Sequence, residues 1–319
     1  MIIVNKPGLL TSIQDKGRYG FQKYGVVASG VMDNYAHRIA NLLVGNDEED
    51  AVIEISLTGP ELFFEEPCTI AICGGDFSPH LNGKAVGTWR PLSIQKDSVL
   101  TFKAAKKGCR AYIALAEGLA IEEVLDSKST YLRGQLGGFG GRALQANDKL
   151  RTKQSNKTPL VETPNWFVAS DYIPVPGQCA LIRAIKGRQY DWFSEDSKKA
   201  LFSSHFTVTN ESDRMGYRLN GAKLELDNAE EMISEAVSFG TIQVPGEGNP
   251  IVLLADRQTT GGYPKIGQIA TVDLPVMAQL KPGDQLRFVE ITIAEAQRLW
   301  LEQERQIQMI KQALPYFIY

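Results

Sequence analysis

The chain has few of the residues that build disulfide frameworks and metal sites. Of its 319 residues four are cysteine, at Cys68, Cys73, Cys109 and Cys179, and three are histidine, at His37, His80 and His205. The histidines are far apart, and the pair Cys68 and Cys73 has no second pair to complete a metal site. None has neighbours at the spacing of metal ligands, and no Cys-x-x-Cys motif is present. The sequence therefore predicts no metal site, and a reducing compartment, the cytoplasm.

Long apolar runs and basic clusters are also missing. The N-terminal apolar stretch is broken by Asn5, Lys6 and Pro7, so it predicts neither a secretory signal nor a spanning helix. The net charge of -3 comes without the Lys/Arg-rich face of a nucleic-acid binder. We expect no nucleic-acid partner and no membrane association. The 43% hydrophobic and 22% charged content is that of a globular protein.

Two common catalytic motifs do not occur. There is no Gly-x-Ser-x-Gly nucleophile turn, and no Gly-rich loop ends in the Gly-Lys-Ser/Thr of a Walker A motif. Hydrolysis by this chain alone, or nucleotide binding by one of its loops alone, therefore lacks its usual signature.

Short strands separated by Gly, Pro, Asn and Asp fill most of the sequence, which predicts a mainly β fold of barrels or sandwiches. Four segments carry this pattern most clearly: 52–57, 68–73, 99–103 and 110–114. Asn-Gly pairs at 82–83 and 220–221 predict tight hairpin turns.

The length favours two domains. Residues 144–151 and 280–287 share Leu, Asp, Leu and Arg at matching positions, as if each closed one half of the chain. The polar stretch 152–164 is a plausible linker. We expect a first domain over residues 1–155 and a second over 156–319.

Two segments have helical patterns. The first runs from about residue 32 to 43, with Ser29 or Asp33 at its start. The second follows a capping box, Thr292 to Glu295, and reaches about residue 314. Its apolar face packs either on its own barrel or on a partner; the sequence leaves both possibilities open.

The segment 251–267 is the strongest candidate site. A buried-type strand leads into consecutive polar residues and two glycines: Asp256, Arg257, Gln258, Thr259, Thr260, Gly261 and Gly262. An arginine fork binds carboxylate or phosphate, and glycines let backbone N–H groups approach an anion. The alternative is a polar hairpin loop without function.

Three further segments combine hydroxyl, acidic and basic residues with glycine. Residues 127–142 place Arg133 before a Gly-rich stretch, residues 212–219 carry Arg214 and Arg218, and residues 11–20 carry Asp15. Each is a candidate contact for an anion or for a partner protein. The alternatives are a flexible connection for the first and surface turns for the other two.

Five ordered motifs resemble the KipA/PxpC family, which also forms the second carboxyltransferase-like portion of urea carboxylase. They are LLTSIQDKGR (9–18), SGVMD (29–33), STYLR (129–133), SDRMGYRL (212–219) and DRQTTGGYPKIG (256–267). The resemblance spans nearly the whole chain. It implies two cyclophilin-like β-barrel subdomains with a few helices, including one at the C-terminus.

The resemblance also implies an activity shared with partners. It implies two partners, a KipI/PxpB-type protein and a PxpA-type protein. Together they would open 5-oxoproline to L-glutamate with ATP hydrolysis. The resemblance therefore also implies ATP with magnesium, bound together with a partner. Two alternatives stay open: a regulator that antagonises a KipI-type inhibitor of a sporulation kinase, and a biotin-dependent urea or amide carboxyltransferase component. The chain has no Ala-Met-Lys-Met motif for covalent biotin.

On these motifs the residue chemistry suggests roles. Substrate or phosphate contacts are expected from the 257–262 segment together with Arg133, Arg214 and Arg218. Asp15, Asp256 and Lys265 are the candidate catalytic residues.

Overall fold

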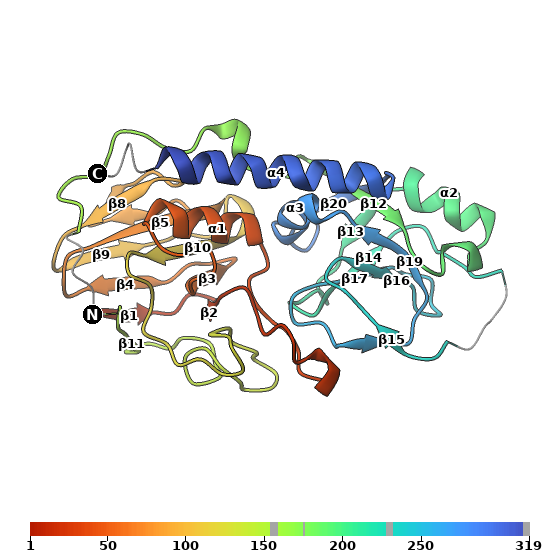
Figure 1. Cartoon of the computed structure of the whole chain (residues 1–319), viewed down its shortest axis with the longest axis horizontal. Helices are drawn as coiled ribbons and strands as arrows, with labels where there is room; N and C mark the ends of the chain where they lie inside the picture. The colour runs from red at the N-terminus through yellow and green to blue at the C-terminus, as the bar shows by residue number, and fades with distance from the viewer. Residues whose placement is uncertain (154–158, 175, 228–231, 315–319) are drawn as a thin grey trace. The chain divides into compact units, whose positions relative to one another are not determined.

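Most of the regular structure of this chain is β-strand, in agreement with the mainly β class predicted from sequence. The computed structural model describes all residues except 154–158, 175, 228–231 and 315–319 (Figure 1). The described chain forms two units. Unit 1 comprises Met1–Arg18, Ser29–Val175 and Gln306–Tyr319, and unit 2 comprises Tyr19–Ala28 and Pro176–Arg305. The boundary expected between residues 155 and 156 lies outside the described residues.

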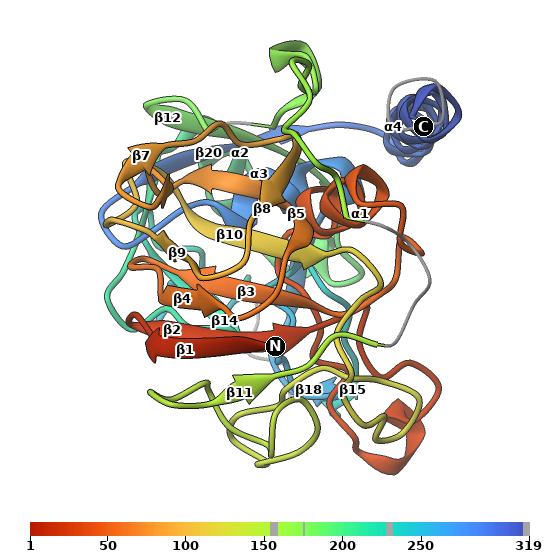
Figure 2. The same ribbon diagram turned by 90° about the vertical axis from the view of Figure 1, so that its left-hand side faces the viewer.

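Unit 1 contains two antiparallel sheets. The first has the order β11-β1-β4-β9-β6-β7: β1 (Ile2–Lys6), β4 (Glu61–Phe64), β6 (His80–Leu81), β7 (Lys84–Ala85), β9 (Ser98–Thr101) and β11 (Lys149–Leu150). The second has the order β2-β3-β10-β5-β8: β2 (Leu10–Gln14), β3 (Val52–Ser56), β5 (Cys68–Asp76), β8 (Pro91–Ile94) and β10 (Lys107–Leu115). Figure 2 shows the strands of the two sheets. Side chains from both sheets form one apolar core between them.

The second sheet of unit 1 is buried on both faces. In β5, Ile70 and Ile72 point into the core between the sheets, whereas Ala71 and Cys73 pack with helix α1 (Asn34–Leu43). This alternation follows from the two-residue period of a strand. Helix α1 starts at Asp33, whose carboxylate accepts the Ala36 N–H at 2.9 Å, as expected for an N-cap.

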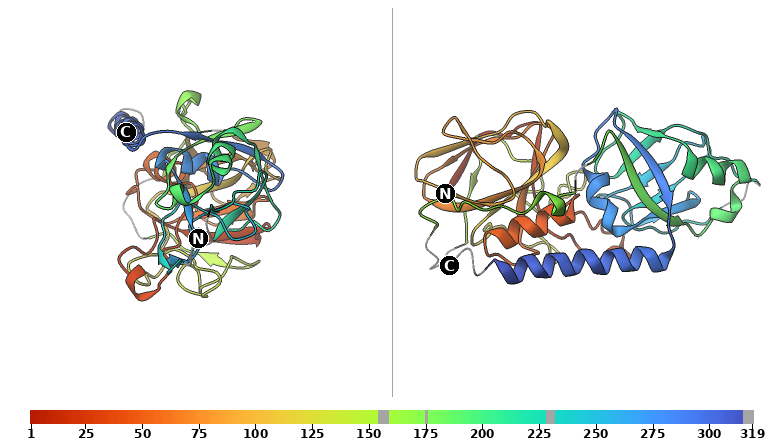
Figure 3. Two further views of the ribbon diagram at one scale, coloured as in Figure 1. Left: turned by 90° about the vertical axis from the view of Figure 1, so that its right-hand side faces the viewer. Right: turned by 90° about the horizontal axis from the view of Figure 1, so that it is seen from above.

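Unit 2 is a closed barrel of order β12-β19-β16-β17-β14-β13-β20: β12 (Cys179–Lys186), β13 (Phe206–Val208), β14 (Gly216–Asn220), β16 (Thr241–Gln243), β17 (Ile251–Leu253), β19 (Lys265–Ile269) and β20 (Gln285–Glu290). The parallel pair β12 and β20 closes it (Figure 3). A separate ribbon joins β15 (Glu235–Ala236) to β18 (Thr260–Gly261). The unit also contains the helices α2 (Glu195–Ser203) and α3 (Leu274–Ala278) and the first part of the C-terminal helix.

Helix α4 (Ile293–Ala313) is the predicted C-terminal helix, and it packs on its own chain. In unit 2, Ala296 and Leu299 pack against a small apolar cluster. In unit 1, Ile307 is fully buried and packs with Leu314 against the α1 cluster. Among the described residues, no helix is long and apolar enough to cross a membrane.

Short 3-10 turns connect several of these elements: Gln22–Tyr24, Ser170–Tyr172, Tyr190–Trp192 and Thr271–Asp273.

Candidate functional site

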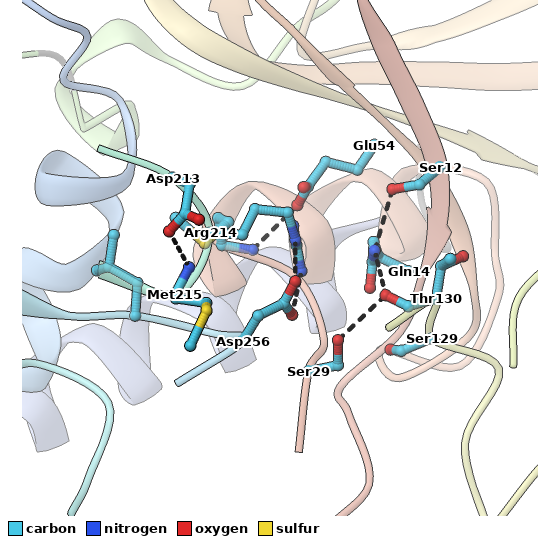
Figure 4. A network of polar contacts seen from close by, with 12 residues as sticks. Ser12, Gln14, Ser29, Glu54, Ser129, Thr130, Asp213, Arg214, Met215 and Asp256 are labelled. Carbon is cyan, nitrogen blue, oxygen red and sulfur yellow. Dashed lines mark hydrogen bonds and ion pairs between the residues drawn. The ribbon is translucent and has the colours of Figure 1, made fainter. Parts of the chain in front are cut away.

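A buried ion pair joins two of the predicted site segments within unit 2. Arg214 lies just before β14 and Asp256 just after β17, and these two strands are paired. The Arg214 Nε lies 3.0 Å from Asp256 Oδ2, and its Nη2 lies 3.3 Å from Oδ1 (Figure 4). Both side chains are 6% exposed. The predicted 212–219 and 251–267 segments therefore come together through a two-point, charge-assisted contact.

Arg257, which directly follows Asp256 in the sequence, is a half-buried cation. Its Nε donates to the Val237 carbonyl at 3.4 Å and its Nη1 to the Leu254 carbonyl at 3.2 Å, and its guanidinium lies 5.9 Å from the centre of the Phe239 ring. Within the described parts of the chain it has no carboxylate partner. Burial lowers the pKa of Arg257 from its ordinary value, and Tyr19 opposes this.

The guanidinium of Arg257 has five N–H donors, and the two carbonyls occupy only part of them. A desolvated cation without a neutralising carboxylate among the described residues is suited to an anionic ligand.

The polar residues that follow Arg257 lie on the β18 ribbon and its turn. Gln258, Thr260 and Gly262 are exposed, while Thr259 and Gly261 are half-buried. A Cβ at Gly261 would lie 2.4 Å from the Gln243 amide nitrogen, so a larger residue there would have to displace the end of the Gln243 side chain. This is a steric reason for the glycine in addition to the anion contact expected from sequence.

Lys265 is the buried cation of a charged cluster on unit 2. Its Nζ lies 2.7 Å from Glu235 Oε2, and Arg188 Nη1 lies 3.3 Å from Glu235 Oε1. The hydrogen bond from Lys265 lowers the pKa of Glu235 despite some opposing desolvation, and Arg188 and Gln189 lower it further. Glu235 thus neutralises Lys265, a relationship that the sequence analysis missed because 30 residues separate the two.

Asp15 lies in unit 1, where its carboxylate holds the segment 127–129. It accepts hydrogen bonds from Ser127 Oγ at 2.7 Å, from the Lys128 N–H at 2.6 Å, from Ser129 Oγ, and from the Gly17 N–H at 2.9 Å. Four donors around one buried carboxylate fix the loop against the end of β2.

The Gly-rich stretch after Arg133 is tightly packed rather than open. A side chain at Gly137 would overlap Arg18, one at Gly138 would overlap Thr130, and one at Gly141 would overlap Gln135. Arg133 itself is exposed. Arg218 is likewise on the surface, with Glu211 Oε2 3.6 Å from its Nε and half of its side chain exposed.

The structure therefore groups Asp256, Arg257, Arg214 and Lys265 on unit 2, and it places Asp15 and Arg133 on unit 1. Sequence reasoning did not single out several polar side chains that are buried in unit 1: Ser12, Gln14, Ser29, Glu54 and Thr130. Alternation along β2 was the available signal, because Ser12 and Gln14 flank the core residue Ile13. Among the described residues, no group of three or more His, Cys, Asp or Glu side chains is arranged to hold a metal ion.

Comparison with known proteins gives consistent results. Residues 24–290 match the family described as carboxyltransferase domain, subdomain A and B. The chain is 35% identical over 300 residues to the C subunit of 5-oxoprolinase from Haemophilus influenzae, covering 94% of each chain. It is 35% identical over 314 residues to the C subunit of 5-oxoprolinase from Escherichia coli, covering 97% of each. The structure of K. lactis urea amidolyase matches with a TM-score of 0.90 and 29% identity, over 97% of this chain and 20% of that one.

Proposed function

This chain belongs to the family of the 5-oxoprolinase C subunits, which carries the carboxyltransferase subdomains A and B, and we propose that it acts as the C subunit of an ATP-dependent 5-oxoprolinase. The observation that carries this proposal is the full-length match to two relatives of that name, with almost no part of either chain left over. The reaction converts 5-oxoproline to L-glutamate in a complex with a KipI/PxpB-type partner and a PxpA-type partner.

Opening a lactam requires activation because an amide carbonyl is a poor electrophile. In the proposed sequence the lactam oxygen attacks the γ-phosphorus of ATP and ADP leaves. Water then adds to the ring carbon, the C–N bond breaks, and hydrolysis of the acyl phosphate releases phosphate and glutamate. The chain needs groups that hold an anionic substrate and exclude bulk water.

Arg257 is the residue best suited to hold an anion. Its guanidinium is desolvated, has free N–H donors, and lacks a carboxylate partner in the described chain, as derived above. We propose that Thr259, half-buried where the adjacent ribbon begins, supplies a hydroxyl for the same ligand. Arg214 and Asp256 support this site by anchoring the end of β17 next to Arg257.

The catalytic roles expected of Asp15, Asp256 and Lys265 stay predictions. Asp15 accepts four hydrogen bonds, which favours a role in positioning the 127–129 loop. Lys265 becomes available to a substrate only if it separates from Glu235.

The residues of this chain fit a nucleotide poorly. In the Gly-rich stretch Gly137, Gly138 and Gly141 are closely packed by neighbouring groups, and the Gln243 side chain lies against Gly261. We therefore propose that ATP, with magnesium, is bound mainly by a partner protein of the complex. The four free cysteines support the cytoplasmic location that is part of the proposal.

The test is conversion of 5-oxoproline to glutamate with coupled detection of ADP, using this chain with its candidate PxpA-type and PxpB-type partners and omitting each component in turn. Turnover that requires all three chains supports the proposal. A mixture of the two partners that is fully active without this chain, or a complete mixture that binds but never turns over ATP, would contradict it.

A second candidate is carboxyl transfer to urea or a related amide. The fold match to urea amidolyase over 97% of this chain favours it. Dependence of turnover on a biotinylated carrier protein separates this candidate from the first. A third candidate, regulation of a KipI-type inhibitor without catalysis, would leave partner binding intact and give no turnover with any amide.

A further inference from the structure

Two polar side chains on β2 lie on the face opposite the core of unit 1. Ile13 points into the core between the two sheets, so Ser12 and Gln14, its neighbours on either side, share the other face. Ser12 is 1% exposed and Gln14 is fully buried. Both pair with β3, opposite Glu54 and Val52 respectively.

The orientation of the Gln14 amide is fixed by its neighbours. Its Nε2 donates to the Thr130 carbonyl at 3.1 Å and to Ser12 Oγ at 3.0 Å (Figure 4). A carbonyl oxygen only accepts hydrogen bonds, so the nitrogen of Gln14 must face Thr130 and the amide cannot be reversed. The Thr130 carbonyl is saturated, because Ser29 Oγ donates to it as well at 3.1 Å.

This arrangement leaves one acceptor and one donor unused. Gln14 Oε1 is buried and has no hydrogen-bond partner in the described structure. Ser12 Oγ accepts from Gln14, so its own proton points elsewhere, and within the described residues no acceptor receives it. A buried acceptor without a donor destabilises the fold unless something completes it.

We propose that Ser12 and Gln14 form a recognition edge for a cis-amide, an inference that rests on the proposed function and names the part of the substrate read here. A lactam or a urea presents its N–H and its C=O side by side, whereas a trans peptide directs them to opposite sides. The ligand N–H donates to Gln14 Oε1, and the ligand carbonyl accepts from Ser12 Oγ.

The lactone analogue of 5-oxoproline, in which oxygen replaces the ring N–H, tests this edge. Its ring oxygen would face Gln14 Oε1, another acceptor, so the assembled complex should bind the lactam at least tenfold more tightly than the lactone. Gln14→Met keeps the size of the side chain and removes its polar atoms. It should weaken lactam binding about tenfold, change lactone binding less than twofold, and so abolish the preference.

Ser12→Ala is the second variant, and it should weaken the lactam and the lactone equally because both keep the carbonyl. Gln95→Met is the matched control, since Gln95 also donates to a serine two residues earlier and to a carbonyl, Val161, but at the surface. This control variant should leave the binding of both the lactam and the lactone unchanged. Two results in Gln14→Met would overturn the inference and mean that water alone occupies the edge. One is an equal weakening of lactam and lactone binding, and the other is an unchanged preference for the lactam over the lactone.

Failure of the proposed function has a different signature, because wild-type complex would then neither bind nor convert 5-oxoproline. The edge is then tested on this chain alone with 2-pyrrolidinone and urea as probes, by ligand-observed NMR. Binding that Gln14→Met abolishes and Gln95→Met preserves supports the inference. Absence of binding to the wild-type chain, or equal binding to both variants, overturns it.

Discussion

Arg214 holds Asp256 at two points, with Nε 3.0 Å from Oδ2 and Nη2 3.3 Å from Oδ1, across 42 residues of sequence. The contact ties the turn before β14 to the end of β17. The backbone supports it, since the Asp256 N–H donates to the Arg214 carbonyl at 2.9 Å. Arg257, the residue proposed to hold an anion, follows directly in the chain.

Removing one member of this pair should destabilise unit 2. Asp256→Ala removes the two-point contact that Asp256 makes with the buried Arg214, at an expected cost of about 3 to 5 kcal/mol in the free energy of unfolding. Urea denaturation followed by circular dichroism measures it. If the free energy of unfolding of Asp256→Ala lies within about 1 kcal/mol of the wild-type value, the pair contributes little to stability.

Two glycines of the 134–141 stretch provide a matched test of packing. Gly137 and Gly140 have nearly the same φ, +67° and +68°, but a side chain at Gly137 would lie 1.8 Å from Arg18 Nη2, whereas one at Gly140 would meet no atom within 4 Å. Gly140→Ala should cost about 1 to 2 kcal/mol from backbone strain alone. Gly137→Ala should cost about 3 kcal/mol or more. Equal melting temperatures for the two variants would contradict the packed loop.

Local chemistry made some of the fold predictable. Asn82 and Gly83 both have positive φ and join β6 to β7, as the Asn-Gly pair predicts. The repeated 144–151 and 280–287 segments also form the same turn. Asp148 and Asp284 each accept the N–H three residues earlier, at 2.7 and 3.0 Å, and Asn147 and Gly283 adopt positive φ at matching positions.

The second Asn-Gly pair shows where such reasoning fails. Residues 220 and 221 form no hairpin, because β14 pairs with β13 and β17 instead. Glycine at position 221 is required because a side chain there would overlap Phe206.

The site was harder to predict than the fold. The residues of the sequence motifs were found, but the partners of Lys265 and Gln14, namely Glu235 and Thr130, depend on strand pairing and loop placement over 30 and 116 residues.

A pH dependence is expected at the C-terminal end of α4. Burial would raise the pKa of Glu48, but hydrogen bonds from Lys311 and Arg38 outweigh it and lower the pKa below the ordinary 4.5. A lowered carboxylate pKa contributes stability above about pH 4.5 that is lost as the pH falls through the folded-state value. Glu48→Gln should remove about 0.5 to 1 kcal/mol at pH 7.

Hydrogen exchange of the amides after Gln306 measures this local effect. Protection in the wild type should decrease below about pH 4.5, and Glu48→Gln should show the low protection at every pH. Glu302→Gln is the control, because its pair with Arg298 lies on the same helix but is exposed. Loss of protection in the control alone would contradict the assignment to Glu48.

Substitution of Arg257 tests the anion site against a matched surface arginine. Arg257→Ala should lower kcat/KM for 5-oxoproline at least tenfold in the assembled complex, because a desolvated fork is lost. Arg257→Lys should recover only part of the activity, since an ammonium lacks the planar fork. Arg218→Ala removes an arginine that is half exposed and faces Glu211, so it should stay within twofold of wild type. If Arg257→Ala keeps full activity while still folded and bound to its partners, Arg257 serves only to join Val237 to Leu254, and the anion must be held elsewhere.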